Sequence, residues 1–166
     1  MAVRPVLHYP AAVLKATADA IDLGPAATQL CADLVDTMRA SPACVGIAAP
    51  QIGVAARAFC MDVTGHQKAR SCSGLVVLIN PEIVAHDGTE VAREGCMSLP
   101  DFTRNVRRAL TVTVRGTTPE GAEREIVADA FEARALQHEI DHLDGLLFLD
   151  RVSSLTADLF PRKRYS

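Results

Sequence analysis

The sequence predicts an α+β fold in which largely antiparallel β-sheets pack around a central helix in the C-terminal half of the chain. Short runs rich in β-branched and aromatic residues, separated by turn signals, occur throughout residues 57–127. A strongly periodic helical segment follows these strands and does not alternate with them, which disfavours a parallel sheet with helical crossovers. With 166 residues, 49% of them hydrophobic, the chain can bury one core without disulfide staples, and we expect residues 1–166 to form a single domain.

The first predicted helix follows an N-terminal segment, residues 1–23, that reads as loop. Pro25 suits the first turn of a helix, which we expect to continue to about Ala40. Four apolar residues recur at helical spacing within it, namely Leu30, Leu34, Val35 and Met38. This segment is therefore predicted to be a packing helix.

The next segment, residues 44–53, is small and apolar except for one amide side chain. Gly46 lets another backbone or a ligand approach closely, and Gln51 brings two N–H donors into apolar surroundings. Two interpretations are open from these residues. The segment lines a substrate groove, or it is a buried turn in which Gln51 bonds to backbone groups.

Strands are predicted in the middle of the chain, at residues 57–63, 75–79, 83–86, 89–93, 110–115 and 125–127. Asp87 and Gly88 form a hairpin turn signal, and residues 116–121 separate the last two strands as a second hairpin. After the central helix, the apolar run 146–149 is predicted to be a short strand or a docking segment. The residues beyond it are predicted to lie at the surface.

The central helix is predicted from about Ala130 to Asp144. Asp129 is an N-cap residue with Glu132 three positions later, which is a capping-box pattern, and Gly145 suits the left-handed residue after a helix. Its apolar face consists of Phe131, Ala135, Leu136, Ile140 and Leu143. Two histidines continue the row of this face, so we expect both to be buried.

This helix carries a His-Glu-x-x-His motif. His138 and His142 lie four residues apart on one helix face, so both rings can bind one metal ion while Glu139 lies beside them. A pair of structural core histidines is the alternative interpretation, and the intervening glutamate argues against it. The motif therefore predicts a hydrolytic metal centre.

Catalytic zinc-type sites commonly use three protein ligands, so a third ligand is needed. No Glu follows Glu139, and Phe148 stands where a third His would complete a His-x-x-Gly-x-x-His pattern. Asp150 or Asp158 would require a rarer arrangement. Cys96 ends a predicted strand segment and follows a glycine, and we predict that its thiolate is the third ligand.

Composition excludes several other classes of function. The net charge of −3 and the absence of a clustered basic stripe argue against nucleic acid as the main ligand, and the basic end at residues 162–164 is interpreted as a solvated tail. No apolar run approaches the ~20 residues of a membrane span. Five cysteines form no regular framework and the N-terminus shows no signal-peptide pattern, so we expect a cytoplasmic protein.

Three motifs in order resemble those of the peptide deformylase family. Residues 44–51 resemble Gly-x-Gly-φ-Ala-Ala-Pro-Gln, residues 94–98 resemble Glu-Gly-Cys-φ-Ser, and residues 137–143 resemble Gln-His-Glu-φ-Asp-His-Leu, where φ is apolar. The resemblance spans about residues 1–150. It implies a catalytic domain that acts in protein biosynthesis. This domain would be a hydrolase that removes the N-formyl group from the initiator methionine of nascent peptides.

The resemblance also implies roles for individual residues. The implied metal ligands are Cys96, His138 and His142. Glu139 would act as general acid and base, taking a proton from water whose pKa the metal lowers, so that hydroxide attacks the formyl carbon. Gln51 and the backbone N–H of Met97 would stabilise the oxyanion, and Gly46 would bond to the substrate backbone. The implied metal is Fe²⁺, with Zn²⁺, Ni²⁺ and Co²⁺ as alternatives.

Two departures from the family pattern stand out. Cys44 occupies the position of the first glycine of its motif. Its side chain either enters the pocket for the methionine side chain, which we favour, or points into the core. The chain stops at Ser166, without the long C-terminal helix that some members use for ribosome docking, so we do not expect ribosome contact by that route, and a transient contact stays open.

Two other functions compete with the deformylase hypothesis. A related amidase for another N-formyl or short N-acyl substrate would share every catalytic part, and only substrate comparison separates it. A catalytically silent, metal-stabilised module that binds nascent chains belongs to a different class. Retention of Glu139 argues against the silent module, because a structural metal site needs no general base.

Overall fold

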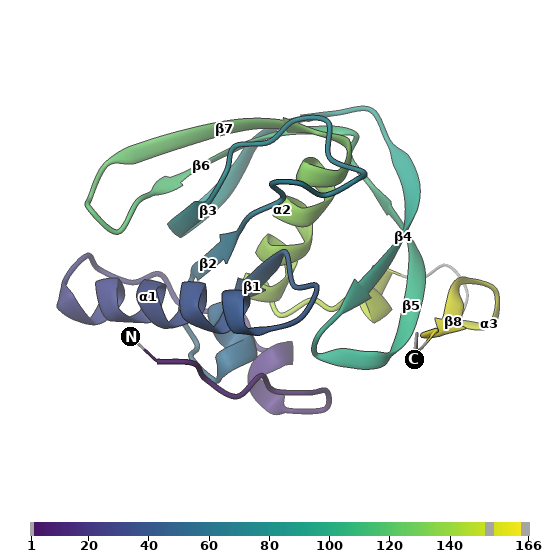
Figure 1. Cartoon of the computed structure of the whole chain (residues 1–166), viewed down its shortest axis with the longest axis horizontal. Coiled ribbons are helices and arrows are strands. Elements are labelled where there is room, and N and C mark those ends of the chain that lie inside the picture. The colour runs from purple at the N-terminus through teal and green to yellow at the C-terminus, as the bar shows by residue number, and fades with distance from the viewer. Residues whose placement is uncertain (1, 152–154, 164–166) are drawn as a thin grey trace.

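The computed structural model describes residues 2–151 and 155–163 and has two antiparallel sheets with helices around them (Figure 1). The larger sheet has the order β1-β2-β3-β6-β7, with β1 (Gly46–Ala48), β2 (Ala58–Met61), β3 (Val76–Asp87), β6 (Thr111–Thr117) and β7 (Glu123–Asp129). The smaller sheet has the order β4-β5-β8, with β4 (Glu90–Cys96), β5 (Leu99–Arg108) and β8 (Leu159–Pro161). The predicted α+β class is confirmed.

The helices are α1 (Pro25–Ala40), α2 (Ala130–Leu143) and the short α3 (Leu155–Asp158), with 3₁₀ turns η1 (Ala12–Lys15), η2 (Ala49–Ile52) and η3 (Phe148–Arg151). The N-terminal and central helices thus form where the sequence predicts them. Gly145 follows α2 with a φ of 72°, which is the left-handed conformation expected at the end of a helix. In the described part of the chain, no helix is both long and apolar enough to cross a membrane.

The five-stranded sheet is covered on both faces. Alternate residues of β2 point to opposite sides, so Phe59 and Met61 join a core with α2, while Ala58 and Cys60 join a core with α1. Leu136 of α2 and Leu34 of α1 are fully buried in these two cores. Figure 1 shows α2 between the two sheets, so one helix contacts both halves of the molecule.

The prediction of a hairpin at Asp87 and Gly88 is wrong, because the two strands that flank this turn do not pair with each other. β3 pairs with β2 and β6, whereas β4 pairs with β5, so the strands on either side of this turn enter different sheets. At this end of β3 one edge is occupied by β6, because Asp87 lies opposite Thr111. Gly88, with a φ of 64°, allows the chain to leave the first sheet at this point.

The predicted capping box of α2 is also wrong, because neither acid makes a side-chain cap. The Asp129 carboxylate accepts a hydrogen bond from the Ser71 N–H at 3.0 Å. The fully buried Glu132 accepts from the hydroxyl of Ser71 at 3.0 Å and from the N–H of Ser73 at 2.6 Å. Both acids therefore fasten the loop between β2 and β3 to the start of α2.

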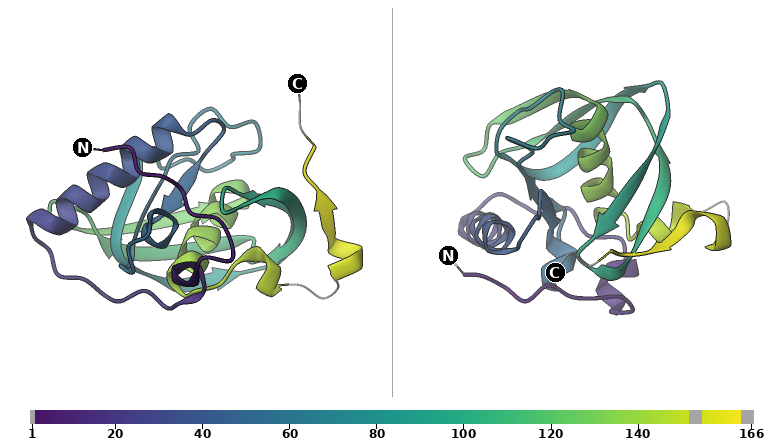
Figure 2. Two further views of the ribbon diagram at one scale, coloured as in Figure 1. Left: turned by 90° about the horizontal axis from the view of Figure 1, so that it is seen from below. Right: turned by 45° about the vertical axis from the view of Figure 1, so that its right-hand side comes forward.

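The C-terminal segment is more ordered than the sequence predicts. The run 146–149 docks through the buried Leu147 and Phe148 and leads into η3, and β8 then adds to the edge of β5 (Figure 2). β8 aligns with β5 so that Phe160 lies opposite Thr103. Arg164, the last residue of the predicted basic tail, lies outside the described residues.

Candidate functional site

The three predicted metal ligands meet where the two sheets approach α2. Cys96 lies at the end of β4, and the two histidines rise from α2 on one face. The Cys96 Sγ atom lies 3.4 Å from Nε2 of His142, and that nitrogen lies 3.2 Å from Nε2 of His138. His142 is buried as predicted, whereas the His138 side chain is 14% exposed and faces the pocket.

The spacing of these three atoms fits a single metal ion. Ligand atoms about 2.0–2.3 Å from a tetrahedral ion lie roughly 3.3–3.6 Å from one another, close to the observed separations. The three ligand atoms all lie within 4.8 Å of one another. One thiol and two imidazoles that converge in this way form a donor set suited to a transition metal.

The local electrostatics favour the anionic form of Cys96. Burial alone would raise the pKa of this thiol, but the charge of His142 and hydrogen bonds from both histidines lower it well below its usual value. Burial would likewise lower the pKa of His138, while Cys96 and Glu94 raise it well above its usual value. A metal ion held by the thiolate and a neutral imidazole would displace a proton from this cluster.

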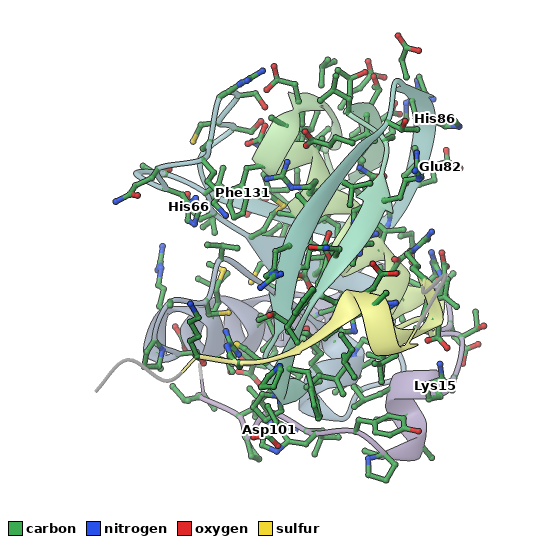
Figure 3. The ribbon with its side chains drawn as sticks, turned by 90° about the vertical axis from the view of Figure 1, so that its right-hand side faces the viewer. Lys15, His66, Glu82, His86, Asp101 and Phe131 are labelled. Carbon is green, nitrogen blue, oxygen red and sulfur yellow. The ribbon has the colours of Figure 1, made fainter. Side chains whose placement is uncertain are left out.

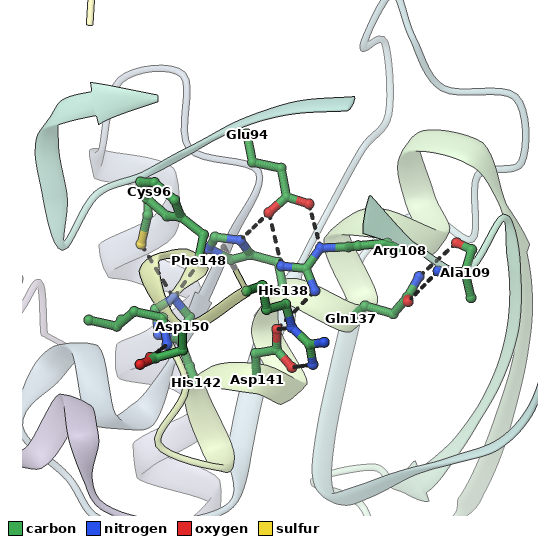
Figure 4. Close-up of polar contacts among 12 residues, drawn as sticks. Glu94, Cys96, Arg108, Ala109, Gln137, His138, Asp141, His142, Phe148 and Asp150 are labelled. Atoms are coloured by element: carbon green, nitrogen blue, oxygen red, sulfur yellow. Dashed lines mark hydrogen bonds and ion pairs between the residues drawn. The ribbon is translucent and has the colours of Figure 1, made fainter. Parts of the chain in front are cut away.

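A buried ionic network holds His138 in place (Figure 4). Nδ1 of His138 lies 3.0 Å from the Glu94 carboxylate, and Arg108 donates two hydrogen bonds to the same carboxylate. Arg108 also donates to Asp141 at 2.9 Å, and Asp141 accepts two hydrogen bonds from Arg151 at 2.5 Å. Burial would raise the pKa of Glu94, but the bonds from His138 and Arg108 lower it to about 2.

The network orients the ligand as well as pairing the charges. A carboxylate only accepts hydrogen bonds, so Nδ1 of His138 carries the hydrogen and Nε2 is left to face Cys96 and His142. Sequence reasoning assigned no role to Glu94, Arg108 or Asp141. One signal was present, because Arg108 follows the buried Val106 at an inward-facing position of β5.

Glu139 is 4% exposed and lies beside the ligands. Within the described part of the chain, its Oε2 atom has no hydrogen-bond partner, so this oxygen is available to a bound molecule. Burial raises the pKa of Glu139, although the charges of the two histidines act in the opposite direction. A Cβ atom on Gly46 would lie 2.7 Å from Oε1 of Glu139, so glycine at this position makes room for the carboxylate.

The amide of Gln51 is fixed at both ends. Its oxygen accepts a hydrogen bond from the Ala48 N–H at 3.0 Å, and its Nε2 donates to the Ser98 hydroxyl at 3.1 Å. The same Nε2 lies 3.8 Å from Cys96 Sγ. Both open interpretations thus describe part of the structure, because Gln51 bonds to the backbone and also presents a donor to the site.

A pocket opens beside the three ligands and Glu139. Cys44, Gly46 and Met97 line it, as do His66 and Phe131, whose rings stack 3.9 Å apart and lie side by side in Figure 3. The Cys44 thiol donates to the carbonyl oxygen of Gly46 at 3.1 Å. Of the residues predicted for the site, all but His142 line this pocket, and His142 is buried against Cys96 and His138. The pocket also has a stacked aromatic wall that the sequence did not reveal.

Comparisons with known proteins identify the family of this chain. The family model described as polypeptide deformylase matches residues 3–158. The chain is 42% identical to the peptide deformylase of Thermodesulfovibrio yellowstonii, covering 98% of this chain and 97% of that protein. It is 41% identical to the peptide deformylase of Syntrophobacter fumaroxidans, with coverages of 98% and 94%.

Solved structures show the same similarity. A peptide deformylase from Legionella pneumophila superposes with a TM-score of 0.84 at 37% identity, covering 93% of this chain and 88% of that one. The peptide deformylase of Ehrlichia chaffeensis in complex with actinonin gives a TM-score of 0.87 at 31% identity, with coverages of 94% and 92%. The chain belongs to the polypeptide deformylase family.

Proposed function

We propose that this chain hydrolyses the N-formyl group of formyl-methionyl peptides with Glu139 as general base and acid. Members of the family are metal-dependent hydrolases that remove this group from nascent peptides, and the chain is an enzyme of this type. The observation that carries the assignment of residues is the meeting of three ligand atoms beside a buried carboxylate with an unpartnered oxygen.

The proposed ligands of one divalent ion are Cys96, His138 and His142. When bound, such an ion supplies Lewis-acid polarisation of a carbonyl and lowers the pKa of water. Oε2 of Glu139 takes the proton from the attacking water and later delivers it to the leaving amine. The raised pKa of Glu139 suits this double role, since the group must accept and release a proton near neutral pH.

Two donors are proposed for the oxyanion that forms on the formyl oxygen. Gln51 presents Nε2 toward the site, and its orientation is set by the bonds to Ala48 and Ser98. The second donor is the backbone N–H of Met97, which lies in the tight turn between β4 and β5 and lines the pocket. Donors held in place before the reaction stabilise developing charge without reorganisation.

The peptide backbone is proposed to bind between two strand edges. In the described part of the chain, β1 pairs only with β2 and β4 only with β5, and both remaining edges border the pocket. An extended peptide can add to such edges, with Gly46 bonding to its backbone. The methionine side chain would then lie against Cys44 and Phe131.

Further proposals concern the setting of the enzyme. We propose that residues 1–166 form one catalytic domain, consistent with a family match over 3–158 and with the contact of α2 to both sheets. The proposed native metal is Fe²⁺, with Zn²⁺, Ni²⁺ or Co²⁺ able to occupy the same donors. The protein is proposed to act in the cytoplasm, with a transient contact to the ribosome.

Substrate comparison tests this function. Protein purified without oxygen and analysed for metal should hydrolyse a formyl-Met peptide and leave the matched acetyl-Met peptide almost intact. Equal turnover of both peptides would favour the alternative of a broader N-acyl amidase. Full metal occupancy without turnover of either peptide would favour a silent binding module. Rapid inactivation by peroxide of the native protein, but not of its zinc-substituted form, would support iron.

A further inference from the structure

We infer that Arg93 and Arg162 make the pocket entrance selective for formyl-methionyl peptides that carry an acidic residue shortly after the methionine. This inference rests on the proposed function and names a substrate preference within it. It comes from the C-terminal strand β8, whose position could not be foreseen from the sequence.

The strand register places both arginines on one face of the smaller sheet. Gly95 of β4 lies opposite Thr103 of β5, and Thr103 lies opposite Phe160 of β8. Side chains two residues apart in a strand share a face, so Arg93 lies on the face of Gly95, and Arg162 continues the face of Phe160. The side chains of Arg93, Phe160 and Arg162 therefore project from the same side of the smaller sheet.

Side-chain contacts also link β4 to the segment of β8 across this face. The Arg93 guanidinium carbon lies 3.7 Å from the centre of the Phe160 ring, which is a cation–π contact. A guanidinium nitrogen of Arg162 lies 3.2 Å from the position that a Cβ of Gly95 would take. The missing side chain of Gly95 lets the Arg162 guanidinium lie over the strand, one residue from the ligand Cys96.

The guanidinium groups of these two arginines form no ion pair within the described part of the chain. Arg134 also lines the pocket, but it forms an ion pair with Glu90, and Glu94 is paired with Arg108. Arg93 and Arg162 are exposed, and in residues 2–151 and 155–163 neither forms a salt bridge. The pocket rim therefore carries two available positive charges, although the whole chain has a net charge of −3.

The location fits residues that follow the methionine. A formyl-peptide whose reacting carbon lies beside Cys96 must extend outward along the pocket rim, at about 3.3 Å per residue. The side chains of the second and third residues after methionine then lie roughly 7–10 Å from the reacting end, within reach of a flexible arginine. A carboxylate at either position would be attracted to the rim, and an ammonium would be repelled.

Matched peptides test the inference. We would compare formyl-Met-Ala-Glu and formyl-Met-Ala-Lys, both amidated at the C-terminus so that only the third side chain differs in charge. The protein should show the higher kcat/KM for the Glu peptide, mainly through a lower KM. Arg162→Gln and Arg93→Gln should each reduce the Glu-to-Lys ratio about two- to fivefold, the range for exposed charge pairs. At about 1 M salt the preference should shrink, because the Debye length falls to about 3 Å.

The control is Arg115→Gln, which removes an exposed positive charge on β6 outside the pocket lining. It should leave the Glu-to-Lys ratio unchanged. An unchanged ratio in both rim variants would overturn the inference, as would an equal change in the control. Equilibrium binding of the two peptides to the Glu139→Gln protein measures the preference without turnover. Equal binding of the Glu and Lys peptides would overturn this inference. Tighter binding of the Glu peptide by a protein whose natural form does not turn over either peptide would overturn the proposed function alone.

Discussion

The two halves of this molecule are stabilised in different ways. The five-stranded sheet is buried between α1 and α2 by apolar side chains on both faces. The three-stranded sheet has a much smaller apolar cluster and instead contains buried charges, with Arg104 fully buried and Arg108 only 4% exposed. The proposed metal site lies at the junction, with two of its proposed ligands on α2 and the third on β4.

This difference separates two requirements of the site. The apolar half positions α2 as a rigid body, since its Leu136 and Leu143 are fully buried in the core. The ionic half sets the orientation of single side chains, because Glu94 and Arg108 direct one nitrogen of His138. Apolar packing is not directional, whereas hydrogen bonds between charged groups are.

The largest effect should come from the ligand supplied by the smaller sheet. Cys96→Ser should lose most of its bound metal and its activity, because a serine hydroxyl stays protonated at neutral pH while a metal-bound thiol ionises. Metal analysis of protein purified without oxygen measures this loss. Cys60→Ser, a buried thiol in the core with α1, is the matched control and should retain the metal. The reverse result would remove Cys96 from the site.

Removing the proposed general base should slow the chemical step and leave metal binding intact. Glu139→Gln should reduce turnover of a formyl-Met peptide by roughly two to four decades, the usual contribution of a general acid–base. Its metal content should stay near one ion per chain, because Glu139 lies beside the three ligands and is not one of them. A variant that loses its metal, or keeps full activity, would show that the role belongs to another group.

Breaking the ionic network should destabilise the protein as much as a core cavity would. Arg108→Met leaves buried carboxylates on Glu94 and Asp141 without this partner, which should lower the free energy of unfolding by about 3–5 kcal/mol. Urea unfolding of the metal-free protein measures the change. The exposed Arg115→Met should shift it by less than about 0.5 kcal/mol. Similar small shifts for both variants would show that the smaller sheet does not depend on its buried charges.

A milder change in the same network should weaken metal binding without abolishing it. Glu94→Gln keeps the size of the side chain but removes the charge that orients His138, and metal affinity should fall about 10- to 100-fold. Competition with a chelator gives this ratio. Glu90 lies on the same strand, pairs with Arg134 and contacts none of the proposed ligands. The metal affinity of Glu90→Gln should therefore match that of the natural protein.

The smallest effect should come from Cys44, which lies where the core with α1 reaches the pocket. Cys44→Gly should change the ratio of kcat/KM for formyl-Met and formyl-Phe peptides about fivefold. This corresponds to about 1 kcal/mol, the lower end for a small group in an apolar pocket. Burial and the nearby charge of Glu139 raise the pKa of Cys44 to about 12, so thiol reagents should modify it slowly at neutral pH. An unchanged ratio with a lower melting temperature would assign Cys44 to packing.

Sequence reasoning reached the local parts of the structure. It predicted α1, α2 and the β6–β7 hairpin because their signals are short-range, namely apolar spacing along a helix and glycines in a turn. The histidine pair follows from the same logic, since four residues on a helix bring two side chains to one face. The third ligand followed from counting donors and from the motif resemblance.

Other parts failed because the deciding contacts are distant in sequence. Asp87 and Gly88 look like a hairpin turn locally, but the strand before them pairs with β6 and the strand after them pairs with β5. Asp129 and Glu132 look like a capping box, but the serines at 71 and 73 compete successfully for their carboxylates. A local pattern cannot reveal a partner that lies dozens of residues away.

By itself, the sequence therefore determined the chemistry available to this protein, because the His-Glu-x-x-His spacing and the supply of donors do not depend on distant contacts. The tertiary structure decided how that chemistry is arranged. Only packing brings Cys96 to His142, 46 residues away, and places Arg108 behind Glu94. Only the addition of β8 brings Arg162 to the pocket rim. These contacts follow from the burial and pairing of whole elements, which near neighbours in the chain do not specify.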